Sequence, residues 1–235
     1  MTSSLTDKTY LITGATGNVG RAIARTFAEA GAKLALVDMN IDAINALISE
    51  IGGNHKAFSA DLGNPEAIDT LLTGIGETFG AVDGLIHTVG GFAMGDPVHA
   101  GNLDVFDRMM TLNARIVYLL AGKVASHMIA KGVKGSISIM LARSGGKGAK
   151  NQAAYTASKA AATRIMESMA LELKEHGIRV NGVSPSIIDT PQNRASMPNV
   201  TPDNWVSPAQ IGDLMVFLAT NSAMTGANIE ISAWS

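Results

Sequence analysis

Residues 9–23 read TYLITGATGNVGRAI and join an apolar run to a glycine-rich turn and the start of a helical pattern. The run TYLIT has the composition of a buried strand. Gly14, Gly17 and Gly20 follow it, and residues 18–31 then repeat apolar side chains at helical intervals. Glycine permits a tight turn and a close approach of the backbone to a ligand. This order predicts the first strand–turn–helix unit of a nucleotide-binding sheet.

The rest of the chain repeats the alternation of strand and helix. Strand-like runs occur at 33–38, 55–61, 82–91, 135–141, 178–185 and 228–232, and helical patterns occur near 41–52, 65–80, 102–131, 153–177 and 208–219. Buried strands separated by helices form a parallel sheet covered on both faces. We therefore expect one domain, 1–235, with a Rossmann-like doubly wound α/β fold of about seven strands in three αβα layers. The irregular segment near 186–207 is expected to cover a substrate.

Composition excludes several classes of protein. Hydrophobic residues make up 46% of the 235 residues, and the net charge is −2. That balance gives a sizeable core and no basic field for nucleic acid or an anionic membrane. There is no cysteine, and the five histidines lack metal-ligand spacing, so we expect neither thiol chemistry nor a metal site. Without a signal-peptide pattern or a membrane-length apolar run, the expected location is cytoplasmic.

The glycine turn and the strand at 33–38 predict where a dinucleotide binds. The helix after the turn offers free N–H groups to a pyrophosphate, with Thr16, Asn18 and Val19 completing the turn. Asp38 ends the run KLALVD, where a carboxylate accepts hydrogen bonds from ribose hydroxyls and repels a 2′-phosphate. The expected cofactor is therefore NAD(H) rather than NADP(H). Asp61, before Leu62 in SADL, either meets the adenine edge or caps a turn; the sequence leaves both open.

Tyr155 and Lys159 are four residues apart, so they share one face of a helix. A free tyrosine has a pKa of about 10. A neighbouring ammonium and a positive nicotinamide ring would lower the pKa of Tyr155 by favouring the phenolate. The phenol is then suited to exchange a proton with a substrate while hydride moves to or from nicotinamide.

These stretches resemble the short-chain dehydrogenase/reductase family over essentially the whole chain. The matching runs are TGATGNVG, SADL, HTVGG, TLNARI, YTASK and VSPSIIDT. The resemblance implies that Tyr155 donates or accepts the proton, Lys159 holds the nicotinamide ribose, Asn113 supports a water relay and Thr190 anchors the carboxamide. It implies a homodimer or homotetramer built on the helices near 113–131 and 153–177. It also places four further residues at the cofactor: Val89, Gly90, Pro185 and Ile188.

The chain departs from the family pattern at four places. The glycine spacing is GxxGxxG, with Asn18 at the position of a usual glycine, and His87 and Thr88 replace two asparagines. Ser186 follows a proline at a position where glycine is usual. Ala142 occupies the position of the catalytic serine. Losing one donor to a developing oxyanion costs roughly 10²–10³ in rate. Three interpretations follow: the activity is lost, Ser144 replaces the serine, or the substrate develops no localised alkoxide.

The third interpretation is favoured by a resemblance to dihydropteridine reductases. The shared features are GATGNVG, VGGFAMG, an alanine thirteen residues before the tyrosine with Arg143 beside it, and DTPQNRASMP followed by Trp205. Asn113 is a signal of the general family instead. A quinonoid dihydropterin is a flat, imine-like acceptor that spreads the arriving charge. Phe92 or Trp205 would stack on the ring of such a substrate, or both side chains would pack within the segment that covers the site. The expected substrate neighbours are Gly91, Phe92, Ala142, Arg143, Ser144 and Trp205.

The expected function is that of an NAD(H)-dependent oxidoreductase. It would transfer hydride between nicotinamide and a small planar imine-like or carbonyl substrate, in the manner of a dihydropteridine reductase. Two alternatives stay open. One is a carbonyl reductase or alcohol dehydrogenase that uses Ser144. The other is a catalytically silent NAD(H)-binding sensor, which Ala142 favours and the Tyr155–Lys159 spacing disfavours.

Overall fold

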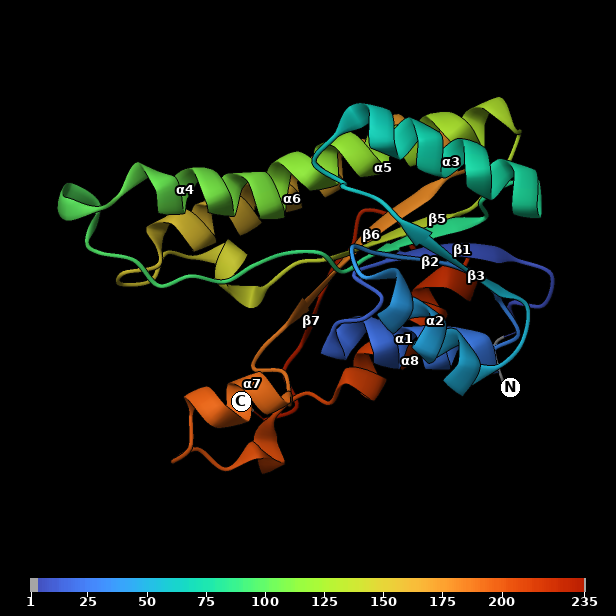
Figure 1. The fold of residues 1–235 in the computed structure, drawn as a ribbon. Helices are drawn as coiled ribbons and strands as arrows, with labels where there is room; N and C mark the ends of the chain where they lie inside the picture. Colours follow the sequence, from blue (N-terminus) through green and yellow to red (C-terminus); the bar gives the residue numbers. More distant parts are fainter. Residues whose placement is uncertain (1–3, 235) are drawn as a thin grey trace.

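The computed structural model describes residues 4–234 and is built on one parallel sheet, shown in Figure 1. The strands lie in the order β3-β2-β1-β4-β5-β6-β7, and each neighbouring pair is parallel. This arrangement confirms the predicted Rossmann-like α/β fold of seven strands. The strand bounds are β1 Thr9–Thr13, β2 Lys33–Asp38, β3 His55–Ser59, β4 Gly84–His87, β5 Ser136–Met140, β6 Arg179–Pro185 and β7 Asn228–Ile231.

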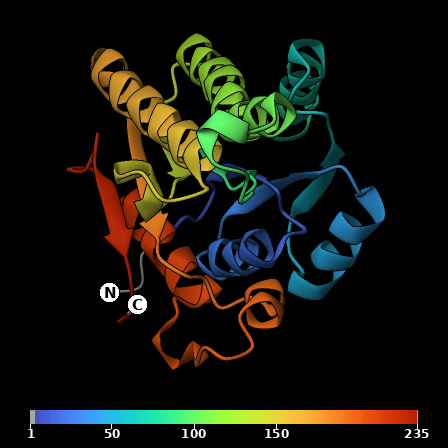
Figure 2. The same cartoon turned by 90° about the vertical axis from the view of Figure 1, so that its left-hand side faces the viewer.

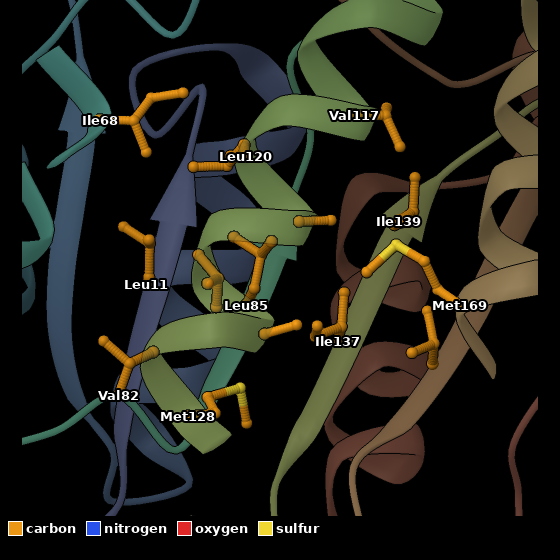
Figure 3. Close-up of a cluster of buried hydrophobic side chains, with 14 of the residues drawn as sticks. Leu11, Ile68, Val82, Leu85, Val117, Leu120, Met128, Ile137, Ile139 and Met169 are labelled. Atoms are coloured by element: carbon orange, nitrogen blue, oxygen red, sulfur yellow. The ribbon is translucent and has the colours of Figure 1, made fainter. Parts of the chain in front are cut away.

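Helices cover both faces of the sheet, as Figure 1 shows. One face is packed against α3 (Pro65–Phe79), α5 (Ile116–Ala130) and α6 (Ala153–Glu172), and Figure 3 shows part of the apolar core between them and the strands. The opposite face is packed against α1 (Asn18–Glu29), α2 (Ile41–Ile51) and α8 (Pro208–Thr220). Because both faces are buried, the central strands are apolar at nearly every position.

Successive strand residues point to opposite faces, which decides where each side chain of β4 goes. Leu85 belongs to the core beneath α5 and α6, and Ile86 belongs to the core beneath α1 and α8. Leu11 and Ile12 of β1 divide in the same way. The next residue of each strand, Thr13 or His87, therefore points to the α5 and α6 side.

The helical region expected at 102–131 is divided by a wider turn. Helix α4 (Leu103–Met110) leads into a π-helical turn, η2 (Thr111–Arg115), which continues as α5. A π-helical turn contains one residue more than the α-helical repeat accommodates, so the side chains before and after it are rotated relative to one another. Periodicity predicted the helix but not this insertion, which carries Asn113.

The segment 186–207, expected to be irregular, contains short helices. These are α7 (Pro191–Ser196), whose N-terminus is capped by the Thr190 hydroxyl, and the 3₁₀ turn η5 (Pro202–Asn204). Figures 1 and 2 show this segment beyond the carboxyl ends of the strands, apart from both helix layers. The remaining 3₁₀ turns are η1 (Val98–Ala100), η3 (Arg143–Gly146) and η4 (Lys174–His176). Within residues 4–234, none of the helices has the length and apolar character that crossing a membrane requires.

Candidate active site

The glycine turn lies at the carboxyl end of β1, where the strand order reverses between β1 and β4. Gly14 has a φ of +68°, a conformation that side chains disfavour. A Cβ on Gly20 would lie 2.0 Å from the carbonyl oxygen of Gly14, so the turn and α1 are in direct backbone contact. Gly17 caps α1 without a side-chain bond, which leaves N–H groups of the first turn free. These features fit a dinucleotide pyrophosphate.

Asp38 is joined directly to this turn. Its Oδ2 accepts hydrogen bonds from the backbone N–H of Thr16 at 3.0 Å and from the Thr16 hydroxyl at 2.6 Å. Asp61 instead uses its carboxylate locally, accepting the N–H of Gly63 at 2.8 Å, which favours the turn-cap interpretation over the adenine contact. Leu62 is buried in the core beneath α3.

Tyr155 and Lys159 lie together on α6, and burial shifts the pKa of both side chains. Lys159 is 6% exposed and donates from Nζ to the Met140 carbonyl at 3.1 Å, and burial lowers its pKa to about 8. Burial raises the pKa of the Tyr155 phenol, and a hydrogen bond with Ser144 lowers it only in part. Among the protein's own groups, desolvation of the phenolate has a larger effect on the Tyr155 pKa than the neighbouring side chains, so the expected lowering depends on the nicotinamide ring.

Ser144 comes to the phenol from η3, two residues after Ala142. Ala142 is buried and begins the turn, while the Ser144 hydroxyl lies close enough to the Tyr155 phenol to lower its pKa in part. The turn is pressed against α6, since a Cβ on Gly145 would lie 3.1 Å from the Lys159 carbonyl carbon. The structure thus places a serine hydroxyl beside Tyr155 although position 142 carries none.

Asn113 is held by the loop that follows β4. Its Oδ1 accepts the N–H of Gly91 and its Nδ2 donates to the Gly91 carbonyl, both at 2.9 Å, and Nδ2 also donates to the Ser158 hydroxyl at 3.0 Å. A Cβ on Gly90 would lie 2.7 Å from Asn113 Oδ1 and 3.2 Å from Lys159 Nζ. Asn113 and Lys159 therefore both lie against Gly90.

The two aromatic candidates are in different environments. Phe92 is 60% exposed, and its ring stands edge-on to Tyr155 with the ring centroids 4.9 Å apart. Trp205 is 5% exposed, beside the bridge between Ile188 and Val206 that closes the segment 186–207. Trp205 therefore acts in packing of that segment, and Phe92 is the aromatic surface left beside the phenol.

The other predicted residues border the same end of the sheet. Asn18 Nδ2 donates to Gln192 Oε1 at 3.1 Å, which connects the glycine turn to α7; Gln192 lies in the run DTPQNRASMP but was not among the predicted site residues. Arg143 pairs with Glu230 of β7, with 3.4 Å between Nε and Oε2. Thr190 Oγ1 accepts the N–H of Asn193 as the cap of α7. Three residues are partly buried against the cores: Val19, Val89 and Ile188; Pro185 is buried at the end of β6.

The profile of the family described as short chain dehydrogenase matches residues 8–200. The chain belongs to this family. It is therefore an oxidoreductase with an NAD(P)(H)-binding Rossmann fold.

Named relatives agree with that assignment. A sorbitol dehydrogenase of Cereibacter sphaeroides is 32% identical over 79% of this chain and 72% of its own, and a levodione reductase of Leifsonia aquatica is 31% identical over 86% and 78%. The crystal structure of an NAD⁺-bound xylitol dehydrogenase matches with a TM-score of 0.91 at 28% identity over 97% of this chain and 99% of that one. These likenesses do not place the chain in the dihydropteridine reductase branch.

Proposed function

We propose that this oxidoreductase uses NAD(H) and exchanges a proton with a small carbonyl or hydroxyl substrate through Tyr155, assisted by Ser144. One observation carries the proposal: the Ser144 hydroxyl of η3 lies close enough to the Tyr155 phenol to lower its pKa in part, on the helix that also carries the buried ammonium of Lys159. Two hydroxyl donors then face one reacting oxygen, which is what a carbonyl being reduced requires.

The cofactor-binding residues follow from the turn after β1. The free N–H groups at the start of α1 would hold the pyrophosphate, and Asp38 at the end of β2 would accept the ribose hydroxyls. The negative charge of Asp38 opposes a 2′-phosphate, which supports NAD(H) over NADP(H). When bound, the nicotinamide supplies or accepts the hydride.

The protein groups manage the proton. With its pKa raised, Tyr155 is protonated at neutral pH and ready to donate to the oxygen of a substrate being reduced. Lys159 provides positive charge one helical turn away, which stabilises the phenolate left after donation. In the oxidative direction Tyr155 must first lose its proton, so that direction is expected to need a higher pH.

A planar imine-like substrate, such as a quinonoid dihydropterin, is the second candidate. Phe92 supports it, because this exposed ring stands beside Tyr155 and offers a surface on which a flat heterocycle can stack. Ala142 supports it too, because charge spread over a conjugated ring needs no second hydroxyl donor. In this case Tyr155 alone would supply the proton.

The test is NADH oxidation with a panel of ketoses, cyclic diketones and quinonoid dihydropterin. Ser144→Ala is compared with Ser49→Ala, an exposed serine of α2 far from the site. The carbonyl proposal expects ketone turnover that falls roughly 10²–10³-fold in Ser144→Ala and not in Ser49→Ala. Turnover with the pterin alone, indifferent to Ser144, would establish the second candidate. NADH binding without turnover on any substrate would reject both and leave a sensor.

A further inference from the structure

His87, at the end of β4, carries a buried nitrogen without a partner. The side chain is 1% exposed, and its Nδ1 lies 2.8 Å from the Thr13 hydroxyl of the neighbouring strand. Its Nε2 is buried and forms no hydrogen bond within residues 4–234. Buried polar atoms are nearly always satisfied, so this nitrogen calls for a partner of its own.

The fold brings His87 to the same corner as Lys159. By the alternation of β4, the ring points to the side of the sheet that α5 and α6 cover. His87 pairs in register with Ile139 of β5, and the carbonyl that accepts from Lys159 Nζ belongs to the next residue, Met140. Adjacent strands lie about 4.8 Å apart, and the Lys159 charge contributes to the lowered pKa of His87, so the imidazole and the ammonium lie at the same corner.

The two groups are complementary as donor and acceptor. Lys159 has three N–H donors, and within the described part of the chain the Met140 carbonyl is its hydrogen-bond acceptor. Burial, with a further contribution from the Lys159 charge, lowers the pKa of His87 to about 3, so its imidazole is neutral near pH 7. An ammonium nearby favours the tautomer whose proton is on Nδ1, donated to Thr13, because the Nε2 lone pair then faces the positive charge.

We propose that neutral His87 is a positioning residue for Lys159, its Nε2 accepting a hydrogen bond from the ammonium through one buried water molecule. Buried waters typically bridge polar atoms that have no other partner, as His87 Nε2 has none within residues 4–234. The interaction stabilises the charged form of Lys159 and so offsets part of the desolvation that burial imposes. The other group that titrates at this corner is Tyr155 of α6. Asn113 of η2, Thr13 of β1 and the Met140 carbonyl of β5 do not titrate.

The catalytic consequence rests on the proposed function, in which the Lys159 charge supports Tyr155. The test compares His87→Asn with His87→Gln. Asparagine places a polar atom at the position of Nδ1 only, whereas glutamine reaches the position of Nε2. For His87→Asn we expect the alkaline limb of the pH profile of kcat to move down by about one pH unit, because the charged Lys159 loses an acceptor. For His87→Gln we expect the limb to return towards the wild-type position, with the KM for NADH unchanged in both.

Each result of this comparison decides the matter. Wild-type profiles in both variants would show that His87 does not act on Lys159. An equal displacement in both would show that the ring, rather than the Nε2 acceptor, is what the site needs. Either outcome overturns the proposal.

A second measurement does not depend on turnover. In ¹⁵N-histidine NMR of the whole protein, the His87 signals are identified by their loss in His87→Asn. We expect a neutral ring with its proton on Nδ1, and in Lys159→Met a displaced Nε2 resonance. An Nε2 resonance that Lys159→Met leaves unmoved would overturn the proposal even in an active enzyme. A wild-type protein inactive on every substrate would reject the function of Tyr155, and the NMR result would still decide the role of His87.

Discussion

Replacing Gly20 by alanine tests whether the contact between the glycine turn and α1 builds the cofactor site. The added Cβ would lie 2.0 Å from the Gly14 carbonyl oxygen, whereas ordinary contact begins near 3.4 Å, so the two atoms must separate by about 1.4 Å. Helix α1 cannot move freely, because Ile23 and Phe27 are fully buried in the core. The displacement therefore falls on the turn that would hold the pyrophosphate.

We expect Gly20→Ala to lose about 1–3 kcal/mol of unfolding free energy, typical of overpacking, and to melt roughly 3–10 °C lower. NADH affinity should fall at least about tenfold, since a misplaced turn loses its charge-assisted hydrogen bonds. The assays are fluorescence titration with NADH and thermal unfolding. Gly122→Ala in α5 is the control, because its Cβ would meet nothing within 4 Å, and it should be neutral or slightly stabilising. A Gly20→Ala protein that binds NADH and melts like the wild type would refute the reasoning.

Three further outcomes are expected. Tyr155→Phe removes the proton donor and should lower kcat at least about 100-fold while NADH titration gives an unchanged affinity; an unchanged kcat would contradict the assignment. Asp38→Asn keeps the shape of the side chain but not its charge, so the ratio of kcat/KM for NADH to that for NADPH should fall about tenfold, and a wild type that prefers NADPH would disprove the argument. The pKa of His87 is lowered from 6.5 to about 3, so between these values the unfolded chain binds a proton that the folded protein does not. The unfolding free energy should accordingly fall with acidification by at most about 1.4 kcal/mol per pH unit. Urea titrations at pH 6.5 and 4.5 should show a smaller decrease in unfolding free energy for His87→Asn than for the wild type. Equal decreases would contradict the burial of a neutral ring.

The fold was predictable because its signals are local and agree with one another. Fully apolar strands such as β1 imply burial on both faces, and the alternation with amphipathic helices implies parallel pairing. The glycine turn could be recognised from the sequence because its glycines are required sterically. A side chain at position 20, for example, would have no space. The four-residue spacing of Tyr155 and Lys159 places both on one helix face without reference to the rest of the molecule.

The remaining features depend on contacts that the sequence does not display. The direction of the Tyr155 pKa depends on how much protein surrounds the phenol, and the position of Ser144 depends on how η3 packs on α6. Whether Trp205 is buried or faces a ligand depends on how its segment folds back. His87 was noted only as a departure from a pattern, since its lack of a partner is a property of the assembled strands.

The π-helical turn at 111–115 makes this stretch sensitive to chain length. Removing one residue there would restore a regular α-helix and rotate everything on one side of the cut by about 100° relative to the other. The Asn113 amide would then leave the Gly91 backbone, while the core contacts of α5 would keep their phase. Surface loops tolerate insertions and deletions, but the number of residues in this helical turn is fixed by the contacts on either side of it. We expect a one-residue deletion there to leave a folded protein in which Asn113 no longer lies beside Gly90 and Lys159.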